Sequence, residues 1–407
     1  MSTVLFTGAS EVVTCTAATP DVVMRDAALL VIDGVVAGIG STDALGSDAE
    51  GIARVDCTGC VLTPGFVDSH THAVFGGWRA AEFALRSRGV AYMEIARRGG
   101  GINASVRDIR ARSEEELVEL ARPRLEAMLS GGTTTAEVKS GYGLDIASEL
   151  KQLRAVRTLQ HEMRLDIVPT FMGAHEFPQE YRDRRAAYVE LVAGEMIQAV
   201  ADEGLAVFCD VFMEPGVFTA AQTRRILEAG VRHGLTPKLH ADELENSAGA
   251  ELAVEFGAAS ADHLGAISAD GIAALASSET VATLLPATLL FLGRTRYAPA
   301  RRLIDAGASV ALATDFNPGS SPTTSMQLVM TLACTQMGMD PLEAIVAATA
   351  GGARALRLTD GTGTLAVGAP GDVLVWDVPD HRELPYRFGA APLRGVWKRG
   401  LRVRPSL

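Results

Sequence analysis

Short β-type runs alternate with helical stretches over most of this chain, and no other feature restricts its fold as strongly. The runs are CVLTPGFVDSH, TTTAEVKSG, LDIVPTFMGAH, LAVFCDVFME, TPKLHADE, SADHLG, TVATLLP and SVALATDFNPG. Strands that alternate with helices form parallel sheets or barrels. These eight runs therefore predict an α/β fold, a (β/α)8 barrel of the TIM type.

The stretch 113–132 carries the patterns that begin and end a helix. Ser113 stands at the expected N-cap position, Glu116 follows at capping-box spacing, and glycines close the stretch. We expect an amphipathic helix here, between the first two strands of the barrel.

The two ends of the chain differ from its middle, because both consist of short β-rich pieces broken by glycine. Chain ends often lie close together in a folded domain. We therefore expect residues 1–62 and 366–407 to form one small β-sandwich domain, and residues 63–365 to form the barrel.

Composition excludes several classes of partner. A net charge of -12 argues against nucleic acid, whose phosphates require clustered Lys and Arg. No apolar run approaches the roughly 18 residues of a membrane span, and the N-terminal sequence has no export signal. We expect a cytoplasmic protein with no membrane partner. Its five scattered cysteines suit reduced thiols, and CTGC at 57–60 suits a structural turn.

Two histidines one residue apart, His70 and His72, follow the first apolar run. Side chains at positions i and i+2 of an extended segment point to the same face, so the pair can converge on one ion. By itself, the pair is equally consistent with two hydrogen-bonded core histidines.

His240 and Asp315 favour the metal interpretation. Each lies at the end of another β-type run, and active sites of such barrels lie where the C-terminal ends of the strands meet. Three neutral imidazoles and one carboxylate suit one zinc or iron ion. Alone, His240 could be an ordinary barrel-end histidine and Asp315 a turn residue.

Two further residues fit proton transfer and charge stabilisation near such an ion. Glu243 follows His240 by three residues and could act as a general acid or base. His263 could stabilise negative charge on an attacked carbonyl oxygen. Without a metal, Glu243 would be better explained as a solvated glutamate. On spacing alone, His263 is also consistent with a core histidine.

These motifs resemble the amidohydrolase superfamily, whose first strand carries an HxH signature, and they are most similar to the imidazolonepropionase family. The similar segments, in the same order, are FGGWRAAEF (75–83), YMEIARRGGGI (92–102), EVKSGYGLD (137–145), PTFMGAH (169–175), KLHADE (238–243), SADHL (260–264), ATDFNPGSSPT (313–323) and ELPYRFG (383–389). Trp78, Glu176 and Phe177 depart from that family's pattern, which leaves the shape of the pocket open.

The resemblance implies hydrolysis of the cyclic amide of 4-imidazolone-5-propanoate to N-formimidoyl-L-glutamate, a step of histidine degradation. It implies one divalent or trivalent metal ion per subunit, zinc or iron. The implied metal ligands are His70, His72, His240 and Asp315, and the implied catalytic residues are Glu243, His263 and Asp315. The implied substrate contacts are Arg79, Tyr142, His175, Glu243, Asn317, Gly319 and Ser320, with Arg79 on the propionate. Tyr92 is a weaker candidate.

Three alternatives remain open. A two-metal hydrolase would need a bridging carboxylated lysine, but Lys139 follows the second run instead of the fourth and suits an ion pair better. A one-metal deaminase of the cytosine or guanine type could use the same ligands, although a neutral base does not need Arg79. A non-catalytic metal scaffold would not need Glu243 and His263. We expect a small-molecule substrate and a homodimer.

Overall fold

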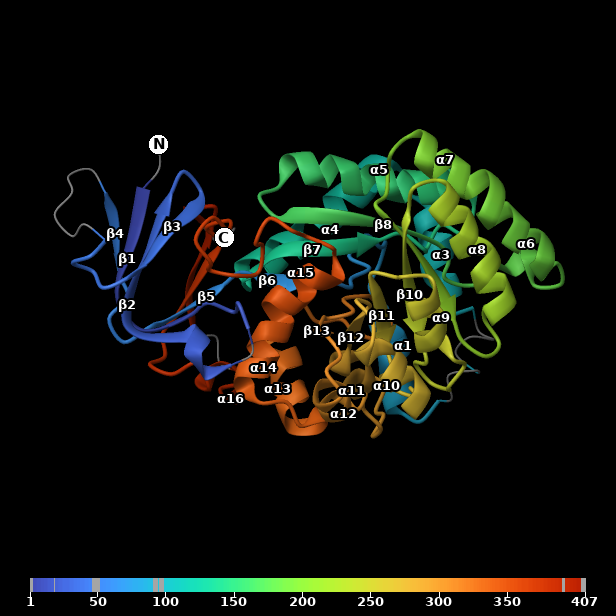
Figure 1. The fold of residues 1–407 in the computed structure, drawn as a ribbon. Coiled ribbons are helices and arrows are strands. Elements are labelled where there is room, and N and C mark those ends of the chain that lie inside the picture. Colours follow the sequence, from blue (N-terminus) through green and yellow to red (C-terminus); the bar gives the residue numbers. More distant parts are fainter. Residues whose placement is uncertain are drawn as a thin grey trace.

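Eight parallel strands form the barrel that the sequence predicts (Figure 1). This computed structural model describes residues 3–17, 19–45, 52–90, 94, 99–389 and 392–403. The barrel strands are β6 (Phe66–Asp68), β7 (Thr133–Lys139), β8 (Asp166–Ala174), β9 (Phe208–Met213), β10 (Thr236–Ala241), β11 (Ser260–His263), β12 (Val281–Leu284) and β13 (Val310–Leu312). They are neighbours in chain order, so each β-type run extends the sheet by one strand.

Contacts between the first and the last strand close the barrel. The side chain of Asp68 accepts hydrogen bonds from the backbone N–H of Thr314 at 3.0 Å and from its hydroxyl at 2.6 Å. Just beyond, the N–H of Asp315 donates to the carbonyl of His70, and a bridge joins Thr71 to Phe316. The closing seam therefore runs directly into the residues predicted to bind metal.

Helices cover the outside of the barrel (Figure 1). They are α1 (Ala80–Ser87), α3 (Ile102–Ala111), α4 (Glu114–Ser130), α5 (Ile146–Glu162), α6 (Arg185–Leu191), α7 (Ile197–Asp202), α8 (Ala220–Arg232), α9 (Gly249–Glu255), α10 (Ala269–Ala276), α11 (Pro286–Phe291), α12 (Ala300–Asp305), α13 (Met326–Met337), α14 (Pro341–Val346), α15 (Gly352–Ala355) and α16 (Glu383–Tyr386). Short 3-10 segments are η1 (Pro20–Val22) and η2 (Gln179–Tyr181), and π-helical segments are η3 (Val192–Met196) and η4 (Ala347–Gly351).

Helix α4 confirms the capping prediction. The hydroxyl of Ser113 accepts from the N–H of Glu116, and the Glu116 side chain accepts from the N–H of Ser113. The helix ends before Gly131, and Gly132 follows with a φ of +102°. Local sequence signals are sufficient here, because every partner lies within one helical turn.

Strands from both ends of the chain form a second sheet. It contains β1 (Thr3–Val13), β2 (Val23–Ile32), β3 (Val35–Gly40), β4 (Ala53–Asp56), β5 (Val61–Pro64), β14 (Val373–Trp376), β15 (Leu393–Lys398) and β16 (Leu401–Val403). Its buried residues, such as Phe6, Leu29, Val375 and Trp397, gather in a core of their own. The expected assembly from both termini is confirmed, while the boundaries 1–62 with 366–407 and 63–365 stay a prediction.

The first β-type run proves to serve both sheets. Its first half is β5, which pairs with β14, and its second half is β6 in the barrel. Gly65 separates them, and a Cβ there would lie 2.1 Å from the hydroxyl of Thr134. The run CVLTPGFVDSH is therefore two strands in two sheets, because the chain changes sheets at a glycine where a larger residue would collide with Thr134.

The two sheets are joined by a partly buried ion pair and by aromatic packing. The ammonium group of Lys398 lies 2.6 Å from Asp166, at the start of β8, and 2.6 Å from Asp372. The rings of Phe66 and Trp376 are 5.7 Å apart. These contacts hold the small sheet against the barrel.

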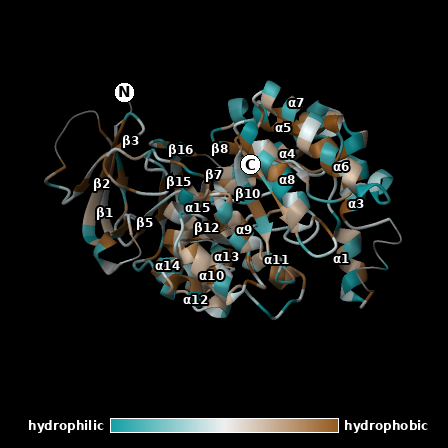
Figure 2. Cartoon of the chain, turned by 45° about the vertical axis from the view of Figure 1, so that its right-hand side comes forward, coloured by the Kyte–Doolittle hydropathy of each residue, from teal (hydrophilic) through white to brown (hydrophobic). Residues whose placement is uncertain are grey.

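The outer helices carry hydrophilic residues beside hydrophobic ones, as amphipathic helices do (Figure 2). Among the described residues, no helix combines the length and the apolar character that crossing a membrane requires.

Substitution of Asp68 tests the seam through its pH dependence. Burial raises the pKa of Asp68 to about 7, so folding favours its protonated form. Its contribution to stability is therefore present at low pH and is lost as the pH rises from its unfolded value toward 7. Asp68→Asn keeps the shape of the protonated group. We expect the free energy of unfolding of this variant, relative to wild type, to grow with pH by on the order of 1 kcal/mol per unit.

Urea unfolding of both proteins from about pH 5 to about pH 8 measures this difference. A difference that is constant over this range would contradict the buried, raised-pKa carboxyl.

Candidate metal centre and active site

The structure brings the four predicted metal ligands together. The ligand nitrogens of His70, His72 and His240 all lie within 4.8 Å of one another. One carboxylate oxygen of Asp315 lies 3.6 Å from Nε2 of His70 and 3.8 Å from Nε2 of His72. The strand ends explain this arrangement, because His70 and His72 follow β6, His240 lies in β10 and Asp315 follows β13.

Two carboxylates orient the histidine rings from behind. Nδ1 of His70 lies 2.6 Å from Asp262, and Nδ1 of His240 lies 3.0 Å from Asp210. A carboxylate on one ring nitrogen leaves the other nitrogen with its lone pair free for a metal. Nε2 of His70 is buried and has no hydrogen-bond partner within the described part of the chain. These residues therefore fit a bound metal ion.

Two buried lysines hold these carboxylates in place. Lys139 lies 2.7 Å from Asp210 and 2.8 Å from Glu137, and Lys238 lies 3.1 Å from Glu137. Burial by itself would lower the pKa of Lys139, but attraction to Asp210, Glu137 and Asp262 outweighs it and raises that pKa. Lys139 therefore forms ion pairs, as its position in the sequence suggested.

Burial also keeps the histidines neutral. It lowers the pKa of His70 and of His72 well below the usual value, and it lowers the pKa of His240 to about 4. A neutral imidazole is the form that binds a metal. Burial raises the pKa of Asp315 to about 6, a cost that a cation on the carboxylate would offset.

Glu243 and His263 lie beside each other at the same end of the barrel. Their closest polar atoms are 3.9 Å apart. Burial raises the pKa of Glu243 to about 7, so its carboxyl can gain or lose a proton near neutral pH. Glu214 accepts hydrogen bonds from the N–H groups of Glu243 and Glu245 and so holds this loop.

Two of the predicted site residues, His263 and Asp315, have unusual backbone conformations. The φ of His263 is +79° and that of Asp315 is +51°, both in the left-handed region. Residues other than glycine adopt this conformation at a cost in free energy. Such strained residues occur at functional sites more often than elsewhere. The hydroxyl of Thr288, 2.5 Å away, donates to the second carboxylate oxygen of Asp315 and fixes its direction.

His175 and Tyr142 extend the cluster away from the ligands. The ring of His175 stacks on that of His72 at 4.9 Å and 13°, and the ring of Tyr142 lies 5.4 Å from His175. Nδ1 of His175 lies 3.0 Å from the carbonyl of Gly141, so its other ring nitrogen remains for another partner. Burial lowers the pKa of His175 to about 4.

Arg79 lies between the carboxylate of Glu82 and the backbone of Gly319. Its guanidinium donates to Glu82 at 2.6 Å. A Cβ on Gly319 would lie 2.2 Å from the guanidinium, so this glycine allows the arginine to approach the loop closely. The Arg86 side chain donates to the Gly319 carbonyl at 3.2 Å.

The loop that holds Gly319 is organised by Asn317. Its side-chain oxygen accepts from the N–H groups of Gly319 and Ser320, and its amide group donates to the carbonyl of Asp315. These bonds keep the loop tight against the metal ligand. The side chain of Asn317 therefore shapes the loop, and its predicted contact with substrate stays a prediction.

Sequence reasoning did not assign a role to the residues behind the histidines. Glu137, Asp210, Lys238 and Asp262 are charged residues inside strands β7, β9, β10 and β11, and all are fully buried. A charged residue within a short apolar run was the available signal. It could not show which charges pair, because the partners lie on different strands. Tyr92 and most of its motif lie outside the described residues.

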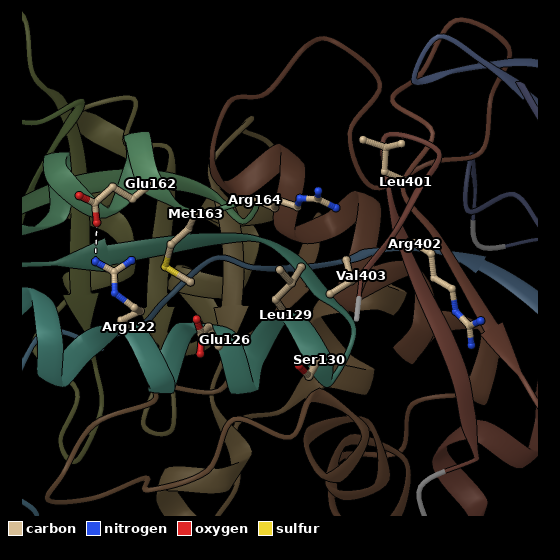
Figure 3. Close-up of a pocket in the computed structure, with 10 residues that line it drawn as sticks. All are labelled: Arg122, Glu126, Leu129, Ser130, Glu162, Met163, Arg164, Leu401, Arg402 and Val403. Carbon is tan, nitrogen blue, oxygen red and sulfur yellow. Dashed lines mark hydrogen bonds and ion pairs between the residues drawn. The ribbon is translucent and has the colours of Figure 1, made fainter. Parts of the chain in front are cut away.

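A surface cleft also lies away from the predicted site residues. It encloses about 650 Å³ between the end of α4, the turn between α5 and β8, and β16 (Figure 3). Arg122 pairs with Glu162 at its edge, and none of its lining residues is a predicted site residue. It lies at the N-terminal ends of the barrel strands, whereas active sites of these barrels lie at the opposite end.

Comparisons with known proteins agree with this geometry. A model of the amidohydrolase family matches residues 61–403. The imidazolonepropionase of Symbiobacterium thermophilum is 48% identical over 387 residues, which cover 93% of this chain and 91% of that protein. The imidazolonepropionase of Myxococcus xanthus is 47% identical over 370 residues, covering 90% of this chain and 88% of that protein.

Solved structures share the fold at much lower identity. The guanine deaminase of E. coli has a TM-score of 0.75 with 15% identity and covers all of both chains. A zinc-containing adenosine deaminase of Xanthomonas campestris has a TM-score of 0.71 with 20% identity, covering 98% of this chain and 92% of that chain. The family match, together with identity near one half to curated relatives, shows that this chain belongs to the amidohydrolase family and, within it, to the imidazolonepropionases.

Proposed function

We propose that this chain hydrolyses 4-imidazolone-5-propanoate to N-formimidoyl-L-glutamate by opening its cyclic amide. The observation that carries the proposal is that four ligand groups, an acid–base pair and an arginine all lie at one end of the barrel. A ring amide needs activated water, a proton carrier and support for the carbonyl oxygen. The propionate needs a cation.

His70, His72, His240 and Asp315 would hold the metal. The set of three imidazoles and one carboxylate suits zinc or iron equally, and we propose one such ion per subunit. When bound, the ion would supply Lewis acidity and make water a stronger acid. Asp315 has a raised pKa and would accept the proton of the attacking water.

His263 and Glu243 would assist the carbonyl and the departing nitrogen. His263 would donate a hydrogen bond to the carbonyl oxygen as negative charge develops there. This charge develops because the water oxygen adds to the carbonyl carbon and the C=O π bond opens. The C=O bond then forms again as the bond from that carbon to the ring nitrogen breaks. Glu243, with a pKa near neutrality, would deliver a proton to this nitrogen. The product carries a new carboxylate.

The remaining residues would hold the substrate. Arg79 would pair with the propionate, and Glu82 keeps the guanidinium from turning away. Tyr142 and His175 would contact the imidazolone ring of the substrate. The loop of Asn317, Gly319 and Ser320 would close around the propionate side chain of the substrate. A homodimer and a cytoplasmic location complete the proposal.

The direct test offers the purified protein 4-imidazolone-5-propanoate, guanine and cytosine separately. We expect ring opening of the imidazolone and no ammonia from either base. In Arg79→Met, KM for the imidazolone should rise by about 10 to 100 fold, because a charged hydrogen-bonded pair contributes about 1.5–3 kcal/mol. An imidazolone without the propionate should not distinguish the variant from wild type. Ammonia release from a base without ring opening would establish a deaminase instead.

His240 tests the metal assignment. Metal analysis of wild type should find about one ion per chain, whereas His240→Ala should lose most of its metal and its activity. His161→Ala is the matched control, because His161 is exposed at the end of α5 and contacts none of the ligands. Full metal content and turnover in His240→Ala would refute the assignment.

Glu243 tests the proton transfer. Glu243→Gln should lower kcat by about 100 to 10,000 fold with its metal content unchanged, because general acid–base catalysis contributes this much. It should also remove the pH dependence of kcat near pH 7 that the raised pKa predicts. Glu245→Gln, two residues along on the exposed side of the same loop, is the control and should retain activity. Equal activity of the two variants would exclude Glu243 as proton carrier.

A further inference from the structure

A buried carboxylate, Glu149, lies beneath the loop that carries Tyr142. Glu149 belongs to the first turns of α5 and is 1% exposed. Its two oxygens accept hydrogen bonds from the N–H groups of Gly141 at 3.1 Å, Gly143 at 2.8 Å and Leu144 at 2.8 Å. Glu149 therefore holds the backbone on both sides of Tyr142.

The same loop determines the orientation of His175. The carbonyl of Gly141 lies 3.0 Å from Nδ1 of His175. Gly141 has a φ of +104°, and a Cβ there would lie 2.9 Å from that nitrogen. A shift of the Gly141 backbone would therefore move His175, whose ring stacks on His72.

Gln152, one turn further along α5, strengthens this arrangement. Its side chain accepts from the N–H of Tyr142 at 3.3 Å and donates to the carbonyl of Val74 at 2.7 Å. Helix α5 thus connects the Tyr142 loop to the segment that follows His72. The Tyr142 loop is therefore held by hydrogen bonds to a helix.

We propose that Glu149 is a positioning residue for the reaction, because its carboxylate holds the loop so that Tyr142 and His175 meet the substrate. This inference rests on the proposed function. A carboxylate is required because all three partners are donors. A glutamine would direct its own N–H2 group at a backbone N–H, and the unpaired donors would push the loop outward.

The test compares Glu149→Gln with Arg154→Ala. Arg154 belongs to the same helix, and its guanidinium donates to the carboxylate of Glu203 at 2.9 Å, away from the loop that Glu149 holds. Both variants remove a contact of α5, but only the first releases the loop. We expect Glu149→Gln to raise KM by about tenfold with metal content unchanged, and Arg154→Ala to lower the melting temperature slightly with KM unchanged.

A double-mutant cycle with His175→Ala identifies the route of the effect. If Glu149 acts through His175, the loss of kcat/KM in the double variant is smaller than the product of the two single losses. The proposal would be overturned if the loss of kcat/KM in the double variant equalled the product of the two single losses. It would also be overturned if Glu149→Gln lowered the melting temperature and left KM unchanged. If Glu149→Gln does not fold, Glu149→Asp makes the same comparison, since it keeps the charge and shortens the reach.

Wild-type turnover of 4-imidazolone-5-propanoate separates this inference from the proposed function. If wild type acts only on another substrate, the proposed function fails, and the same comparison of variants on that substrate decides the role of Glu149.

Discussion

The pairing of buried charges beneath the histidines is the interaction on which the site depends. Asp262 and Asp210 orient His70 and His240, and two lysines lie within ion-pair distance of these carboxylates in the barrel interior. Removing such charges from water costs several kcal/mol per ion unless each finds a partner. The closed barrel supplies those partners from neighbouring strands. The ligand nitrogens are therefore oriented by the protein before any ion binds.

The seam of the barrel and the metal centre share residues. Asp68 binds Thr314 across the seam, and the next contact joins the backbone of His70 to that of Asp315. An ion held by His70, His72 and Asp315 would thus link the first strand of the barrel to the last. Metal binding and closure of the barrel would then stabilise each other, because an ion that binds only the folded chain favours folding.

Three loops around the site are held in the same way, by a carboxylate that accepts hydrogen bonds from backbone N–H groups. Glu149 holds the loop of Tyr142, Glu214 holds the loop of Glu243, and Glu82 accepts from Gly101 while it binds Arg79. Loops on a scaffold are usually its most mobile parts. Anchoring these loops from below keeps the side chains of the proposed substrate site in place without occupying the space above them.

The sequence by itself determined the eight strands, the cap of α4 and the strand ends that carry His70, His72, His240 and Asp315. These signals are local, since alternation and capping involve residues a few positions apart. It could not determine that the change of sheet falls at Gly65, or that Asn317 organises its own loop. Only the tertiary structure decided which buried charges pair, because His70 and Asp262 are 192 residues apart and Asp68 and Thr314 are 246 apart. Such pairings depend on which strands become neighbours, and no local pattern contains that information.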